Sequence, residues 1–501
     1  MRGHPRAIGW VGVAALAASS AFGDASSSTS LADAAELGDS ERVRTLLASG
    51  GDPNATQVDG MTALHWAVHR DDLATAELLV ESGASVRTSS RYGVAPLSLA
   101  CVNGSREMVE LLLDAGADPN TTLRGGETVL MTASRTGRVG AVKALLSHGA
   151  EVGARESTAR QTALMWSAAE GHADVVRELV RAGANPSARL ASGFTPLLFA
   201  AREGRIDALR ELLEAGADPN DLIRPPADAP SQARGYRGAP PFGASALLIA
   251  VENGHFELAV ELLDAGADPN AAMPGYTVLH AIARARKPGM GDNDPPPQGS
   301  GDLSSLGFVR EIARRGADLN ARMPKNINLG NTRLRKLGAT PYFLAAQSAD
   351  AELMRTLASL GADVRIPNAD NSTPLMAAAG LGTRSPGEDA GTEPEVLEAV
   401  GVALELGADI NAVDDNGETA MHGAAYKNLP AVVEYLASKG AELSVWNTEN
   451  RFGWTPLAIA TGYRFGNFKP SQVTVDAIRR VMLADGVLPP ERIEATTQQI
   501  Y

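Results

Sequence analysis

The sequence predicts an all-α solenoid, an elongated and curved stack of short helix pairs joined by hairpin turns. Two observations predict it: a segment that recurs along the chain, and a helix–turn–helix pattern inside each copy. Gly60, Gly93 and Gly126 open equivalent segments 33 residues apart. Such a period is typical of architectures in which each unit packs only on its neighbours. We therefore expect one continuous core in these 501 residues, not several globular domains.

Residues 193–220 form the clearest copy and show why each unit should fold as two helices. The hydroxyl of Thr195 can cap the first helix, and Pro196 follows at the first helical position. Gly204 separates the two helices, and Gly216 can end the second one in the left-handed conformation. The copy therefore carries its own start and stop signals.

The apolar residues of this copy are expected to pack between neighbouring units. Leu209, Leu212 and Leu213 form the apolar side of the second helix, and Leu197 lies in the first. One helix pair cannot cover its own apolar face, so each copy depends on its neighbours. An aspartate in place of Leu213 should therefore open the stack.

Two further motifs repeat with the same period. Gly-Ala-Asp-Pro-Asn ends the second helices at 116–120 and 266–270, and residues 62–67 read Thr-Ala-Leu-His-Trp-Ala. The pattern resembles the ankyrin repeat, which has a period of about 33 residues and a Thr-Pro-Leu-His-x-Ala signature. The resemblance covers residues 29–488 in about 12 repeats and points to the secreted or periplasmic bacterial type.

The repeats fall into two blocks. We expect repeats 1–6 at 31–220, an insertion at 221–242, repeats 7–12 at 243–488 with insertions at 286–302, 321–337 and 380–394, and a tail at 489–501. Insertions between units should extend the hairpin turns, and insertions inside units should extend the helix–helix turns, so the two kinds should emerge on different sides. These insertions either contribute to a binding face or are surface loops that the fold accommodates at little cost.

Residues 1–23 predict a cleavable secretory signal peptide. Arg2 and Arg6 precede an apolar run that is too short to span a bilayer comfortably, and a small-residue site follows. Residues 24–30 then form a polar tether. We expect a periplasmic or secreted protein with no membrane span after cleavage; an uncleaved anchor is the alternative.

The composition argues against several classes of protein. A net charge of −14 disfavours nucleic-acid binding, because phosphate contacts need clustered Lys and Arg. The single cysteine, Cys101, allows no disulfide framework and is expected to be buried. No phosphate-binding loop, nucleophile elbow or zinc-protease motif occurs, so we predict a non-enzyme without cofactors.

A metal site is the main rival hypothesis. His65 and His69 are four residues apart on one predicted helix, a spacing that can direct two ring nitrogens at one ion. A histidine in the repeat motif usually turns inward, however, and the sequence offers no third ligand. We therefore assign no metal ligands.

The resemblance implies a protein or peptide partner on the concave groove. In ankyrin repeats the groove is lined by positions beside the turn glycine and just before the mid-unit glycine. Carried onto this sequence, the main candidates are Arg91, Tyr92, Arg124, Phe194, Arg202, Tyr426, Lys427, Arg451, Phe452, Trp454 and Tyr463, with Asp59, Met61, His69, Arg70, Asn103, Arg135, Glu203, Phe242, Glu252 and Asn253 in support. The C-terminal group is richest in residue types that dominate binding hot spots. Alternatively, its aromatic side chains turn into the cap of their own repeat stack.

We expect a monomeric, non-enzymatic scaffold or adaptor that binds a protein or peptide outside the cytoplasm. Two alternatives stay open: a structural spacer in the cell envelope, and an exported, effector-like binder that acts on a host protein. Trp66 and Trp166 occupy a semi-buried helix position and are expected to pack in the core.

Overall fold

The computed structural model describes residues 30–224, 242–273, 275–288, 296–327, 332–464, 470–491 and 493. The predicted all-α class is confirmed, since these residues form helices joined by short turns. Contacts divide the chain into an N-terminal unit and a C-terminal unit, with the boundary between residues 235 and 236. The predicted signal peptide, most of the tether, most of the 221–242 insertion and most of the tail lie outside the described residues.

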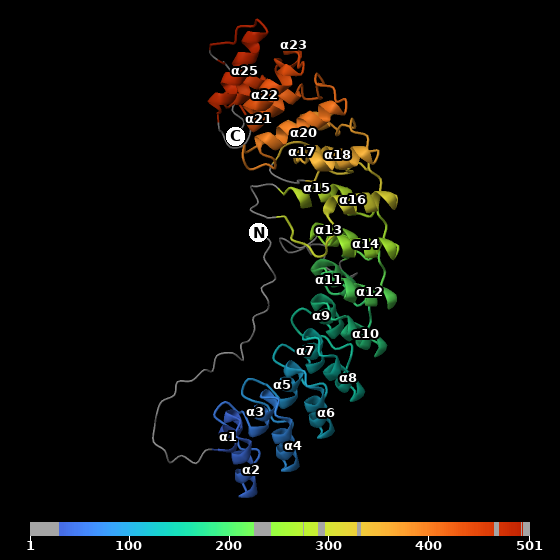
Figure 1. The fold of residues 1–501 in the computed structure, drawn as a ribbon, viewed down its shortest axis with the longest axis vertical. Coiled ribbons are helices and arrows are strands. Elements are labelled where there is room, and N and C mark those ends of the chain that lie inside the picture. Colours follow the sequence, from blue (N-terminus) through green and yellow to red (C-terminus); the bar gives the residue numbers. More distant parts are fainter. Residues whose placement is uncertain are drawn as a thin grey trace, which may run out of the picture. The chain divides into compact units, whose positions relative to one another are not determined.

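The described part of the N-terminal unit consists of six helix pairs (Figure 1). The first helices of the pairs are α1 (Leu31–Leu37), α3 (Ala63–His69), α5 (Pro96–Asn103), α7 (Val129–Arg135), α9 (Ala163–Glu170) and α11 (Pro196–Glu203). The second helices are α2 (Ser40–Ala48), α4 (Leu73–Glu81), α6 (Arg106–Asp114), α8 (Val139–Ser147), α10 (Ala173–Arg181) and α12 (Ile206–Glu214). First helices contact first helices and second helices contact second helices, so the unit has two layers.

The described part of the C-terminal unit repeats this arrangement. Its pairs are α13 (Ala246–Glu252) with α14 (Phe256–Asp264), α15 (Val278–Arg286) with α16 (Ser305–Arg314), α17 (Pro341–Gln347) with α18 (Ala351–Ser359), α19 (Pro374–Ala378) with α20 (Glu393–Glu405), α21 (Ala420–Lys427) with α22 (Pro430–Ser438), and α24 (Pro456–Thr461) with α25 (Gln472–Ala484). A short helix, α23 (Leu443–Trp446), precedes α24, and two short strands, β1 (Ala272–Met273) and β2 (Tyr276–Thr277), pair antiparallel before α15.

Local capping explains where the helices begin and end. The hydroxyl of Thr195 accepts a hydrogen bond from the backbone N–H of Leu198, and Gly204 ends α11 with φ of 69°, as predicted. Arg160 and Asn371 stand where other repeats have the turn glycine, and both adopt positive φ, 62° and 57°. Asparagine tolerates this conformation, but arginine does not favour it, so at Arg160 the repeat imposes the turn.

The apolar seam between repeats differs from the prediction at one residue. Leu197 and Leu212 are buried, as expected, but Leu213 is half-buried. Leu209 is the buried partner of Leu212 on α12, because residues three apart share a helix face. The buried face of α12 is therefore rotated away from Leu213.

The insertions at 321–337 and 380–394 meet, although we expected them on different sides. The backbone N–H of Arg333 donates to the carbonyl of Gly382 at 2.8 Å, and the Thr332 hydroxyl donates to the same carbonyl at 3.1 Å. Gly382 has φ of 78°, and a Cβ there would lie 2.6 Å from the backbone nitrogen of Leu334. The two insertions thus touch through a backbone contact that only glycine permits.

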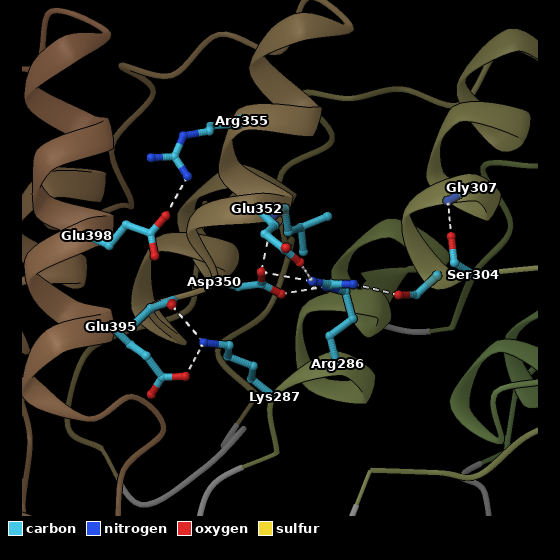
Figure 2. Close-up of polar contacts among 12 residues, drawn as sticks. Arg286, Lys287, Ser304, Gly307, Asp350, Glu352, Arg355, Glu395 and Glu398 are labelled. Carbon is cyan, nitrogen blue, oxygen red and sulfur yellow. Dashed lines mark hydrogen bonds and ion pairs between the residues drawn. The ribbon is translucent and has the colours of Figure 1, made fainter.

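An ion-pair network joins three helix pairs of the C-terminal unit (Figure 2). Arg286, at the end of α15, binds both carboxylate oxygens of Asp350, at 2.6 and 3.1 Å. Asp350 is 1% exposed and also accepts a hydrogen bond from the N–H of Leu353, so it caps α18. Lys287 continues the network to Glu395 on α20, at 2.7 Å. Because Asp350 is buried, it depends on Arg286 to offset its charge.

Substitution of Leu212 tests the packing of the repeats. Leu212→Asp buries an unpaired charge and should lower the free energy of unfolding by several kcal/mol, on the order of 3–5. Leu213→Asp should have a much smaller effect, because that side chain already reaches solvent. Urea denaturation followed by circular dichroism measures both. Equal losses would show that the assigned face of α12 is wrong.

Removal of Asp350 tests the network of Figure 2. Asp350→Ala leaves the Arg286 guanidinium without its buried partner and removes the cap of α18, so we expect a loss of about 3–5 kcal/mol. Glu398→Ala, which breaks the exposed pair with Arg355, should cost less than about 1 kcal/mol. Both follow from denaturant unfolding of the full chain, and similar costs for the two would contradict a structural role for the Arg286–Asp350 pair.

Candidate functional site

The turns between repeats and the ends of the first helices form one surface of the N-terminal unit, which we call the turn face. Backbone hydrogen bonds link successive turns: the N–H of Arg91 donates to the carbonyl of Asp59, and the N–H of Ser157 donates to that of Gly125, each at 2.8 Å. These bonds therefore hold the backbone of the turns in a fixed row.

Side-chain hydrogen bonds fix the turns to the first helices. The amide nitrogen of Gln57 donates to Asp33 and Glu36 of α1, at 2.9 and 2.6 Å, and its amide oxygen accepts from the indole of Trp66 in α3, at 2.7 Å. Asn103 donates to the carbonyl of Val68 at the end of α3, at 2.7 Å. Each repeat therefore positions the end of the helix before it.

The exposed large apolar side chains of the N-terminal unit gather on its turn face. In the part of this unit that the structure describes, these side chains are Leu37, Val58, Tyr92 and Val102. Val58 is 84% and Tyr92 is 63% exposed, both on turns, whereas Leu37 and Val102 lie at the ends of α1 and α5. Exposed apolar groups that cluster on one face usually mark a contact surface for another protein.

Arginines surround these apolar groups. Arg70, Arg91 and Arg124 are exposed on the same turns and helix ends. Arg70 donates to the carbonyl of Glu36 at 3.0 Å, and Arg124 donates to that of Arg91 at 3.4 Å. The charge of Arg70 also acts on the nearby carboxylate of Asp72. Around Tyr92 the turn face thus combines apolar groups with the exposed Arg91 and Arg124, while Glu36 and Asp59 add negative charge elsewhere on the same face.

The structure separates the sequence-predicted contact residues into exposed and buried ones. Arg91, Tyr92 and Arg124 are exposed on the turn face, as an interface requires. Phe194, by contrast, is buried against Phe199, with the ring centroids 5.1 Å apart. Arg202 is half-buried, and its Cζ lies 5.2 and 5.1 Å from the centroids of these two rings. Phe194 therefore packs inside the repeat, and Arg202 covers it.

The predicted C-terminal group turns largely inward. Tyr426 and Trp454 are buried, and the Tyr426 hydroxyl donates to Glu418 at 2.8 Å. Lys427 is also buried, and its ammonium donates to the carbonyl of Ala390 in the 380–394 insertion. These side chains therefore offer no surface to a partner in this structure, in keeping with the alternative that the aromatics belong to the cap of their own stack.

The remaining members of that group reach solvent to different degrees. Arg451 is exposed, with its Cζ 4.7 Å from the ring centroid of Phe452, which is half-buried. Tyr463 is half-buried and donates to the carbonyl of Ile493 at 3.4 Å. Of the supporting candidates, His69 and Arg70 are exposed, whereas Asp59, Met61, Asn103, Arg135, Glu203, Phe242, Glu252 and Asn253 are half-buried.

The histidine pair does not present a joint metal site. His65 is buried, and both ring nitrogens are engaged: Nδ1 by the hydroxyl of Thr62 at 2.7 Å, and Nε2 by the carbonyl of Val94 at 3.1 Å. Burial lowers the pKa of His65. His69 instead lies edge-on to the ring of Trp66. Within the described residues, no group of three His, Cys, Asp or Glu could hold a metal ion.

Sequence reasoning missed a set of buried charged side chains in the C-terminal unit. Lys336, in the 321–337 insertion, is 1% exposed and donates to the amide oxygen of Gln347. Burial lowers its pKa to about 7, and the charge of Asp389 opposes this only in part. A lysine in a long loop is usually solvated, so the sequence carries no signal of this burial.

Lys336 predicts a pH-dependent stability. Its pKa is about 7 in the folded chain against 10.5 in the unfolded one, so between these values the unfolded chain holds the extra proton. The free energy of unfolding therefore rises with pH across this window. Lys336→Met removes this pH dependence. The free energy of unfolding of the variant should exceed that of the wild type most at pH 7. The difference should shrink by up to about 1.4 kcal/mol per pH unit above pH 7.

Urea denaturation at intervals from pH 7 to pH 10 measures this gap. Lys325→Met is the matched control, because Lys325 is an exposed lysine of the same insertion. Its stability difference from the wild type should not change with pH. A gap for Lys336→Met that stays constant over the range would contradict the burial of a largely neutral lysine.

Comparison with known proteins agrees with this architecture. A family model described as ankyrin repeats in three copies matches residues 31–123, 130–223 and 393–469, and a model of the single ankyrin repeat matches 242–273. These matches cover more than half of the chain, and the chain belongs to the ankyrin-repeat family.

One relative is a Fowlpox virus (strain NVSL) protein named as an ankyrin repeat protein, FPV219. It is 44% identical over 50 residues, which are 10% of this chain and 12% of that protein. The likeness is therefore confined to a short stretch of both proteins. Searching the described residues for membrane spans finds no helix with the length and apolar character to cross a bilayer.

Proposed function

We propose that this ankyrin-repeat protein is a non-enzymatic scaffold that binds another protein or a peptide through the turn face of its N-terminal unit. The coincidence of exposed apolar side chains with arginines on that face carries the proposal. Val58 and Tyr92 supply apolar contact area, and Arg91 and Arg124 supply positive charge. The complementary partner is a segment with acidic and apolar side chains.

The rigidity of the turn face favours binding. The hydrogen bonds of Gln57 and Asn103 already order the turns and helix ends in the free chain. Binding therefore loses less conformational entropy than it would on mobile loops. An aromatic side chain such as Tyr92 adds contact area at a low entropic cost, because it has only two side-chain torsions.

The corresponding surface of the C-terminal unit is less available. All eight residues of α21 are buried, whereas α11 ends on the half-exposed Arg202 and Glu203. The 321–337 and 380–394 insertions meet over this part of the unit, as the contacts of Arg333 and Lys427 show. This difference favours the N-terminal unit as the contact region.

The number of repeats and the type of protein are part of the same proposal. We propose that all of the helix pairs are ankyrin repeats, about 12 in number, and that the protein is of the secreted or periplasmic bacterial type. The basic start and short apolar run of residues 1–23 support export. A spacer in the cell envelope and an exported binder of a host protein are alternative settings for the same turn face.

Peptide display tests the proposal. The full chain is immobilised and panned against a random peptide library, and the enriched peptide is then synthesised and titrated by fluorescence anisotropy. We expect peptides that combine Asp or Glu with apolar residues. The double variant Arg91→Glu/Arg124→Glu and the variant Tyr92→Ala should each weaken binding by about 10- to 100-fold, as for interface hot spots.

Arg42→Glu is the matched control. Arg42 is an exposed arginine of α2, outside the turn face, so the same charge change there should leave the affinity within about twofold, as expected for a residue outside the contact. The proposal fails if the enriched peptides lack acidic residues, or if the double variant binds them as tightly as the wild type does.

A further inference from the structure

Three buried cations lie together in the C-terminal unit, around the contact of its two insertions. Lys336 belongs to the 321–337 insertion, Lys427 ends α21, and Arg464 follows α24. Lys427 and Arg464 both donate to carbonyls of the 380–394 insertion, those of Ala390 and Thr383, and Asp389 of the same insertion acts electrostatically on all three cations. A group of buried positive charges needs nearby negative charge or hydrogen-bond acceptors to be stable.

Arg464 lacks enough acceptors. Its side chain is only 7% exposed, and Nη2 donates to the carbonyl of Thr383 at 3.0 Å. Its Cζ lies 5.9 Å from the ring centroid of Tyr426. Nε and Nη1 are buried and have no hydrogen-bond partner. Unsatisfied buried donors are rare in folded proteins and call for an explanation such as an unseen ion.

The carboxylates of this region do not balance the buried cations. Asp389 faces Lys336, Lys427 and Arg464 together, and burial raises its own pKa. Glu418 is already the acceptor for the Tyr426 hydroxyl and for the amide of Asn450, each at 2.8 Å. Glu395 also acts on Lys427 but is already paired with Lys287, so Asp389 is the carboxylate that acts on all three buried cations.

The pKa shifts run in the direction that this imbalance predicts. Burial lowers the pKa of Lys336 to about 7, that of Lys427 to about 8 and that of Arg464 to about 10. Elsewhere in the same unit, Arg315 has a raised pKa, because it is hydrogen-bonded to Asp264 and Glu311. The cations around the insertions thus lack the anionic partner that Arg315 has.

Exposed arginines continue the positive charge to the surface. Arg333, Arg384 and Arg451 are exposed and come from the two insertions and from the turn before α24. The positive charges of Arg384 and Arg451 both lower the pKa of Arg333, after partial burial as the main cause, so the three lie within electrostatic reach of one another. Charge of one sign at a surface raises the local concentration of ligands of the opposite sign.

We propose that the buried cations around the meeting insertions form a binding site for a small, doubly charged oxyanion, such as phosphate or a phosphoryl group. Arg464 donates from Nε and Nη1, and Lys427 supplies further ammonium donors beyond its contact with Ala390. Lys336, which is largely neutral above pH 7 in the free chain, becomes a further donor when the bound anion favours its protonated form. A phosphate oxyanion suits this set because it brings several acceptors and two negative charges.

The site has a structural consequence for the two insertions. Lys336 comes from one insertion, and Asp389 and Thr383 come from the other. An oxyanion bound among them adds charge-assisted hydrogen bonds that need both insertions in place. Binding therefore stabilises their contact, because a ligand stabilises the conformation that it selects.

Calorimetric titration of the full chain with inorganic phosphate tests the proposal, at constant ionic strength with chloride as the background anion. We expect saturable binding with one phosphate per chain. Arg464→Met keeps side-chain volume but removes the donors, and should weaken binding by about 10- to 100-fold. The matched control is Arg315→Met, which removes a half-buried arginine paired elsewhere and should leave the affinity unchanged.

Further arms distinguish the source of the oxyanion. Tighter binding of phosphoserine than of inorganic phosphate points to a phosphoryl group carried on a protein, and the reverse order points to the free ion. If circular dichroism shows that Arg464→Met does not fold, Arg384→Gln/Arg451→Gln at the exposed rim replaces it and should weaken binding by at least about threefold, in line with steering by exposed charge. The proposal is overturned if the wild type binds no phosphate, or if a folded variant binds it unchanged.

Discussion

The structure depends on the inability of any one helix pair to bury its own apolar face. In the described repeats the first helices are short, and α11 and α21 have eight residues each. Helices of this length are not stable alone, because most of their stability comes from tertiary packing. Contacts between successive first helices and successive second helices supply that packing within each unit. The caps and turns then serve mainly to keep each pair in register with its neighbours.

This dependence explains which features could be predicted from the sequence. The cap at Thr195 and the break at Gly204 are local signals, and the structure confirms both. The inward turn of the motif histidine His65 was likewise expected. The sequence predicted that both Leu212 and Leu213 are buried, which is wrong for Leu213, because adjacent leucines both fit the apolar pattern of one helix.

The C-terminal group was harder to place for a non-local reason. The position of Tyr426 in its repeat matches positions that face a groove in other repeats, but its surroundings come partly from Asn450 and Arg464, which follow it in the chain. Glu418 and Asn450 take up its hydroxyl, and Arg464 lies over its ring. The position of a residue within its repeat predicts which side of the helix it lies on. It does not predict which residues an insertion 50 or more positions away will cover. The contact between Thr332 and Gly382 spans 50 positions.

The contact between the two insertions changes how this part of the chain responds to sequence variation. A loop that reaches only solvent accepts changes in length at little thermodynamic cost. Here Leu334 packs against Gly382, and Lys427 donates to Ala390 beneath the same loop. Shortening either loop would bring water to charged groups that the other loop now encloses. The two segments, whose contacting residues Thr332 and Gly382 are 50 positions apart in the sequence, are therefore expected to vary together as one structural element.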